Sequence, residues 1–143
     1  MTREELAEFN IGENLDQLMN LDPRGYGVCR ILYAGSRSYT GEALTMHCAN
    51  ALDKLLKEGD VVVLITGFIL WPHRHPETDG IVSTVLLARG LVQAYGVTPV
   101  IVCPSENAAS IGEMVQYTGL HLYEDVETAK ELPLSVGVIP FTK

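Results

Sequence analysis

A single short run of β-branched residues constrains the fold of this chain more than any other feature. Residues 61–65, "VVVLI", are uniformly apolar, with Asp60 before the run and Gly67 two positions after it. A half-exposed strand alternates apolar and polar residues, whereas an unbroken apolar run of this length is typical of a parallel strand buried on both faces. We therefore predict a buried parallel strand at residues 61–65.

Strand-like and helix-like segments alternate after this run. The helical segments are "DGIVSTVLLARGLVQAYG", which we expect Asp79 to cap and Gly96 to end, "SENAASIGEMVQYTG", with Ser105 as the cap, and the capped turn "DVETAKEL". Further strands are predicted at residues 100–103, 121–123 and 136–139. This alternation indicates right-handed crossovers and a Rossmann-like α/β fold: an open, mostly parallel sheet of about four strands with helices on both faces.

The first part of the chain is predicted to be helical. Apolar residues recur at helical spacing in "GENLDQLMNL", in "YGVCRILYAGSRSY" and in "EALTMHCANALDKLLKEGD". We expect a single α/β domain or half-domain over residues 1–143, mainly helical over residues 1–58 and alternating between strand and helix over residues 59–143.

The amino-acid composition and net charge indicate which kinds of partner the protein can bind. The chain has 143 residues, of which 47% are apolar, and a formal net charge of -8, which disfavours binding to nucleic acid or to an anionic membrane. Cys29, Cys48 and Cys103 have no C-x-x-C spacing, and their apolar surroundings predict reduced core residues. The longest nearly uncharged run is too short to cross a bilayer, and the polar start lacks a signal-peptide core. We expect a soluble, cytoplasmic protein whose partner is a small molecule or another protein.

The candidate site is the polar stretch "TGFILWPHRHPETDG", residues 66–80, which follows the apolar run directly. In open α/β sheets, ligands bind beyond the carboxyl ends of the strands. Gly67 allows a sharp turn or close approach to a ligand, and a helix starting near Gly80 offers unpaired N–H groups to an anion. The alternative is that Asp79 only caps the helix and Gly80 only relieves crowding.

The same stretch raises the question of a metal site. His73, His75, Glu77 and Asp79 alternate, so an extended segment would point them the same way. An H-x-H pattern alone is a weak signal, and no second cluster with ligand spacing follows, so we predict a solvent-exposed loop without a metal. The sequence also lacks the nucleophile elbow, the phosphate loop, the dinucleotide fingerprint and the H-E-x-x-H motif.

Several segments together resemble the D-glutamate cyclase-like family, of the C-terminal-domain type. They are the strand exit "VVVLITGF", the following "PETDG", the helix "IVSTVLLARGLVQAYG" and the earlier "IGENLDQLMNLDPRG". Ile81 and Ser83 stand where the family often has proline and glycine. Family domains run to about twice this length and carry a G-D-G-G-N-E type motif in their second half, which has no counterpart here, so the chain is similar to the first half.

The resemblance implies a carbon–oxygen lyase that uses no cofactor. In the implied reaction, the amine of D-glutamate attacks its own γ-carboxyl group, giving 5-oxo-D-proline and water. The chemistry needs a base for the amine and an acid for the departing oxygen, and Glu77 and Asp79 are the only paired carboxylates at a predicted strand exit. The candidate substrate-binding residues are Thr66, Gly67, Phe68, Thr78 and Gly80.

A second class of function stays open. The alternative is that the chain is a noncatalytic α/β module that binds a small acidic metabolite or acts as a partner subunit. In either case we expect a small acidic, amino-acid-like ligand. A half-domain leaves a strand edge or an apolar face uncovered, so we also expect a homo-oligomer or a complementary second-half chain.

Overall fold

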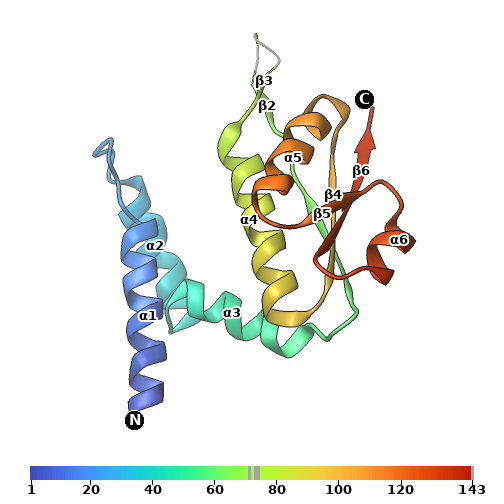
Figure 1. Cartoon of the computed structure of the whole chain (residues 1–143). Coiled ribbons are helices and arrows are strands. Elements are labelled where there is room, and N and C mark those ends of the chain that lie inside the picture. Colours follow the sequence, from blue (N-terminus) through green and yellow to red (C-terminus); the bar gives the residue numbers. More distant parts are fainter. Residues whose placement is uncertain (71, 73–74, 143) are drawn as a thin grey trace. The chain divides into compact units, whose positions relative to one another are not determined.

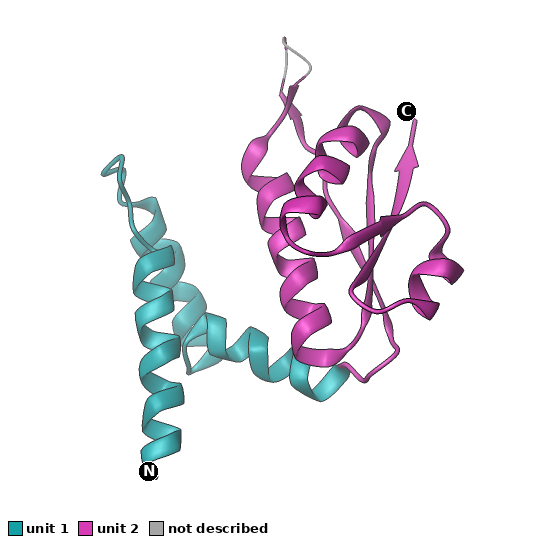
Figure 2. Cartoon of the chain, viewed as in Figure 1, with its two compact units in different colours: residues 1–55 teal, residues 56–143 magenta. Residues whose placement is uncertain are grey.

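The chain divides into two compact units, residues 1–55 (unit 1) and residues 56–143 (unit 2), coloured separately in Figure 2. The computed structural model describes residues 1–70, 72 and 75–142. The elements described in unit 1 are all helices, and the described strands all belong to unit 2.

Unit 1 consists of α1 (Arg3–Met19), α2 (Val28–Thr40) and α3 (Leu44–Leu55). A capping box starts α1: the Thr2 hydroxyl accepts the Glu5 N–H at 3.1 Å, and the Glu5 carboxylate accepts the Thr2 N–H at 2.7 Å. Gly41 ends α2 in the left-handed conformation that glycine adopts without strain. The predicted helical N-terminal segment is therefore confirmed.

Unit 2 alternates strands and helices in the predicted order (Figure 1). Its elements are β1 (Val61–Ile65), β2 (Ile69–Leu70), β3 (His75–Pro76), α4 (Thr78–Tyr95), β4 (Thr98–Pro104), α5 (Ser105–Tyr117), β5 (His121–Tyr123), α6 (Val126–Glu131) and β6 (Ser135–Phe141). Four strands form one sheet in the order β1-β4-β6-β5, and all its pairings are parallel. The predicted α/β fold is confirmed, and each predicted strand lies within an observed one.

A short hairpin interrupts this pattern between β1 and α4. β2 and β3 pair antiparallel, with Ile69 opposite Pro76 and Leu70 opposite His75. The stretch predicted as a solvent-exposed loop therefore contains a hairpin at these four residues, which the sequence did not predict. Two-residue strands are too short to leave an alternation pattern in the sequence, and the proline in one of them argues against a strand.

Helices cover both faces of the sheet. On one face, Ile81, Val85 and Ala88 of α4 and Ile111 and Val115 of α5 form the core with buried residues of β4 and β6. On the other face, α6 contacts β4, β5 and β6. None of the helices described is long and apolar enough to cross a membrane.

The strand from which the prediction started is less buried than expected. β1 lies at one edge of the sheet, and Val61, Val63 and Ile65 on one of its faces are 43%, 57% and 79% exposed. Burial of β1 on both faces was therefore a wrong expectation, because an apolar run alone does not distinguish a central strand from an edge strand. The strand buried nearly throughout is β4, which lies between β1 and β6.

The cysteine prediction holds for one residue of three. Cys103 of β4 is buried, and burial raises the pKa of its thiol, whereas Cys29 and Cys48 are exposed. The prediction that all three belong to the core is wrong, because α2 and α3, the helices that carry Cys29 and Cys48, contribute no buried residue.

Candidate functional site

A hollow of about 470 Å³ lies where β1 ends and α4 begins. Its lining comes from the end of β1, the turn after it, the start of α4 and the last residue of β6. The lining residues are Ile65, Thr66, Gly67, Phe68, Glu77, Gly80 and Phe141. The hollow therefore lies beyond the carboxyl ends of parallel strands, where α/β sheets bind ligands.

Gly67 gives the hollow its shape. Its φ of 123° lies in a region that residues with a side chain rarely adopt. A Cβ atom built on Gly67 would lie 2.1 Å from Cδ of Pro104 and 2.9 Å from Nδ2 of Asn107. Only glycine fits here, because both the backbone conformation and the space exclude a side chain.

Backbone and hydroxyl hydrogen bonds fix the two sides of the hollow relative to each other. The Thr66 hydroxyl donates to the Gly80 carbonyl at 3.1 Å, which ties the end of β1 to the first turn of α4. The Glu77 N–H donates to the Phe68 carbonyl at 2.9 Å and closes the hairpin against the helix start. Glu77 is exposed, so its carboxylate is accessible at the rim.

The structure brings together five of the seven residues that the sequence selected. Thr66, Gly67, Phe68, Glu77 and Gly80 line the hollow. The other two, Thr78 and Asp79, are exposed in the first turn of α4 and do not belong to the lining.

Asp79 does not cap α4, contrary to the prediction. Glu77 occupies the N-cap position, with no capping hydrogen bond from its side chain, and the helix starts at Thr78. The Asp79 carboxylate instead accepts the N–H of its neighbour Gly80 at 2.8 Å. The backbone of Glu77 is extended, with φ of -70° and ψ of 123°, as expected of an N-cap residue. Glutamate is not among the residue types preferred at an N-cap, so the sequence misplaced the start of α4.

Ser105 is a second corrected cap. It is the first residue of α5, Pro104 occupies the N-cap position, and the Ser105 hydroxyl donates to the Phe141 carbonyl at 3.0 Å. By contrast, Gly96 ends α4 and Asp125 caps α6 by accepting the Thr128 N–H at 3.1 Å, so both of those predictions are confirmed. Hydrogen bonds from Thr128 lower the pKa of Asp125.

Sequence reasoning missed three residues at this site. Ile65 and Phe141 line the hollow, and Asn107 of α5 lies directly behind Gly67. Phe141 and Asn107 are distant from the candidate stretch in the sequence, so only the sheet pairing of β6 with β4 and the position of α5 bring them there. No pattern in the sequence around Asn107 distinguished it, because Ser105 and Glu106 precede it directly.

Two histidines were named as candidate metal ligands in the sequence. His73 lies outside the described residues, and His75 belongs to β3. Across the described part of the chain, no three His, Cys, Asp or Glu side chains are grouped closely enough to hold a metal ion.

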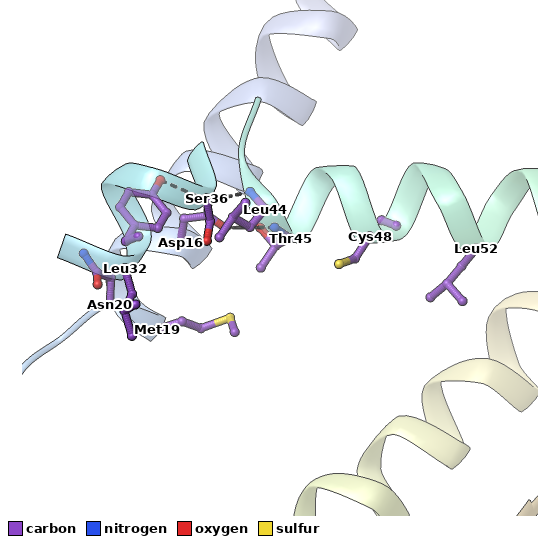
Figure 3. Close-up of a pocket in the computed structure, with 11 residues that line it drawn as sticks. Asp16, Met19, Asn20, Leu32, Ser36, Leu44, Thr45, Cys48 and Leu52 are labelled. Atoms are coloured by element: carbon purple, nitrogen blue, oxygen red, sulfur yellow. Dashed lines mark hydrogen bonds between the residues drawn. The ribbon is translucent and has the colours of Figure 1, made fainter. Parts of the chain in front are cut away.

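A second cavity, of about 550 Å³, lies within unit 1 among α1, α2 and α3 (Figure 3). Most of its lining is apolar, and Asp16 lies at its polar end. The Asp16 carboxylate accepts the Leu44 N–H at 2.6 Å, the Thr45 N–H at 2.9 Å, the Thr45 hydroxyl at 2.7 Å and the Tyr33 hydroxyl at 3.0 Å. Asp16 of α1 thus caps α3 from another helix.

The charge of Asp16 is well compensated. Burial by itself raises the pKa of this carboxyl, but the hydrogen bonds from Thr45, Leu44 and Tyr33 outweigh it and lower the pKa from 3.8 to about 2. Arg37 is 3.8 Å from Asp16 and also pairs with Glu13, which raises the pKa of Arg37. The Asp16 carboxylate already accepts hydrogen bonds that hold the helices of unit 1 together. We therefore place the candidate functional site in unit 2.

Comparison with known families agrees with the motifs at the unit 2 hollow. Neither a curated protein nor a solved structure matches the chain. One family model, described as D-glutamate cyclase-like, C-terminal, matches residues 15–136, which include the end of α1 and the whole of the β1-to-α4 segment. Because this match covers most of the 143 residues, the chain belongs to the D-glutamate cyclase-like family.

Proposed function

We propose that the unit 2 hollow binds D-glutamate and that the chain, as a D-glutamate cyclase-like lyase, dehydrates it to 5-oxo-D-proline. The observation that carries this proposal is the position of Glu77, whose carboxylate stands at a hollow walled by two glycines at a helix start. Membership of the family supports the choice of reaction. The volume of about 470 Å³ is within the range of small-molecule sites.

The proposed reaction forms one bond and breaks one. The amine nitrogen attacks the γ-carbon, the C–N bond forms, the C–O bond breaks, and the departing oxygen leaves as water. The ammonium nitrogen loses two protons, and both end on the departing oxygen. Glu77 would take them from the nitrogen, and a carboxyl group of Glu77 or Asp79 would pass them to the departing oxygen. A walled hollow would also favour the folded conformer of the substrate, which raises the rate by restricting rotation.

The charges around the hollow suit both kinds of charged group in an amino acid. Glu77 at the rim attracts an ammonium group, while the N-terminal end of α4 attracts a carboxylate. The Gly80 N–H already bonds to Asp79, so a ligand carboxylate would use this N–H only after displacing the Asp79 side chain.

Binding without turnover is the second candidate. It is favoured by one observation: of the two carboxylates that the reaction would use, Asp79 is not part of the lining. In that case the chain is a module that binds a small acidic metabolite.

The experiment follows 5-oxo-D-proline formation from D-glutamate by the full chain and by Glu77→Gln and Asp79→Asn. Loss of a general acid or base typically costs about 10²- to 10⁴-fold in rate, so we expect Glu77→Gln to lose at least 10²-fold. Glu113→Gln, at an exposed position of α5, is the matched control. Unchanged turnover in both site variants contradicts the proposed roles, and binding of D-glutamate without turnover in the wild type selects the second candidate.

A further inference from the structure

Asn107 stands out among the buried residues of unit 2. Its exposed fraction is 0%, and within the described part of the chain neither its amide nitrogen nor its amide oxygen has a hydrogen-bond partner. An unpaired buried amide reduces stability, whereas an apolar side chain of similar size would not. Ile111, one helical turn further along the same helix, is also 0% exposed, so apolar residues are compatible with this face.

The amide lies beside Gly67. Asn107 Nδ2 is 2.9 Å from the place where a Cβ of Gly67 would be. Gly67 itself lines the hollow. Gly67 is therefore adjacent both to the amide and to the hollow, and its lack of a side chain allows Nδ2 to lie this close.

The start of α5 adds a second feature suited to a negative charge. Asn107 is the third residue of α5, a 13-residue helix whose N-cap position, Pro104, makes no side-chain capping bond. The neighbouring α4 also starts without a side-chain cap, whereas side chains of Thr2 and Asp125 cap α1 and α6. N-terminal N–H groups and the positive end of the helix dipole attract a carboxylate.

We propose that Asn107 and the start of α5 form a carboxylate subsite of the unit 2 hollow. A ligand carboxylate moves the Gly67 turn and accepts a hydrogen bond from Asn107 Nδ2, which gives the buried amide its partner. Gly67 permits this movement because glycine has access to more backbone conformations than any other residue. This inference takes only the class of ligand from the proposed function. An amino acid with a carboxylate side chain has two carboxylates, one for the start of α4 and one for the start of α5.

The test uses glutarate, a dicarboxylate without the amine, and D-glutamate as probes of the full chain. Binding is measured by calorimetry, and the side-chain amide resonance of Asn107 is followed by NMR. We expect glutarate to shift this resonance and to bind Asn107→Leu at least about tenfold more weakly than the wild type, because a hydrogen bond to a charged group corresponds to a factor of ten or more. Without ligand, Asn107→Leu should melt no lower than the wild type, because it removes an unpaired amide.

Two controls keep the proposal falsifiable. Gln116→Leu changes an exposed amide on the same helix and should leave glutarate binding unchanged. If Asn107→Leu crowds Gly67 and does not fold, Asn107→Ala replaces it; failure of both variants to fold would show that the amide serves the fold and would overturn the proposal. Wild-type affinity for glutarate in the Asn107 variants, or no glutarate binding by the wild type, would also overturn it. Glutarate binding without conversion of D-glutamate rejects the cyclase activity alone and leaves the subsite standing.

Discussion

The two units of this chain are stabilised by different interactions. Unit 2 has one cluster of buried apolar side chains from α4, α5 and the sheet. In unit 1, all of whose residues are described, only Gly12, Asp16 and Ala43 are buried, and large side chains such as Ile31 and Leu32 are 75% and 65% exposed. Four long-range hydrogen bonds of unit 1 converge on one carboxylate instead. Apolar burial therefore supports the unit with the hollow, and a polar network supports the helical unit.

The largest expected difference between the units comes from the same substitution made in each. Ile101→Ala removes a 0% exposed side chain of β4 and should lower the free energy of unfolding by about 2–5 kcal/mol. Ile31→Ala, on α2, should change it by less than about 0.5 kcal/mol, because that side chain is already largely in water. Urea unfolding followed by circular dichroism measures both. Comparable losses in the two variants would contradict the contrast.

The second prediction concerns the hollow itself. Gly67→Ala forces a side chain into a left-handed backbone and against Pro104, so we expect a loss of about 3 kcal/mol in the free energy of unfolding. Gly90→Ala is the matched control: its Cβ meets nothing within 4 Å in the middle of α4, and it should stabilise by about 0.5–1 kcal/mol. Thermal unfolding of both variants measures these changes. A Gly67→Ala variant as stable as the wild type would contradict the prediction.

The same contrast explains what the sequence could predict. Alternating strands and helices follow from local patterns, so the order of elements in unit 2 and the main strands were predictable. The exposure of a side chain depends on its neighbours in space. The sequence therefore could not predict the exposed face of β1 or the exposure of Cys48. Within the hollow, Gly67 and Glu77 belong to one short stretch that the sequence could identify. Phe141 and Asn107 come from later elements that only the parallel pairing and the position of α5 bring close.

The third prediction tests the polar network of unit 1. Asp16→Asn replaces one acceptor oxygen by an NH₂ group that faces donors, so some of the N–H and hydroxyl groups of Leu44, Thr45 and Tyr33 lose their partner. We expect a loss of about 1–3 kcal/mol and faster hydrogen exchange at the start of α3. Asp53→Asn, at an exposed position of α3, is the control and should have little effect. Unchanged exchange in α3 would mean that Asp16 does not hold these helices together.

The smallest expected effect is the dependence of that network on pH. Hydrogen bonds lower the pKa of Asp16 from 3.8 to about 2 in the folded chain, so folding favours the ionised carboxylate. Its stabilisation is therefore complete above about pH 4 and is lost as the pH falls towards 2. The pKa of Asp125, the N-cap residue of α6, is also lowered. Asp125 is present in both the wild type and Asp16→Asn, so its contribution cancels when these two proteins are compared. We expect the difference in their free energies of unfolding to shrink over this pH range in a urea series. If the difference stays constant down to pH 2, the Asp16 carboxylate is not held in its ionised form by its neighbours.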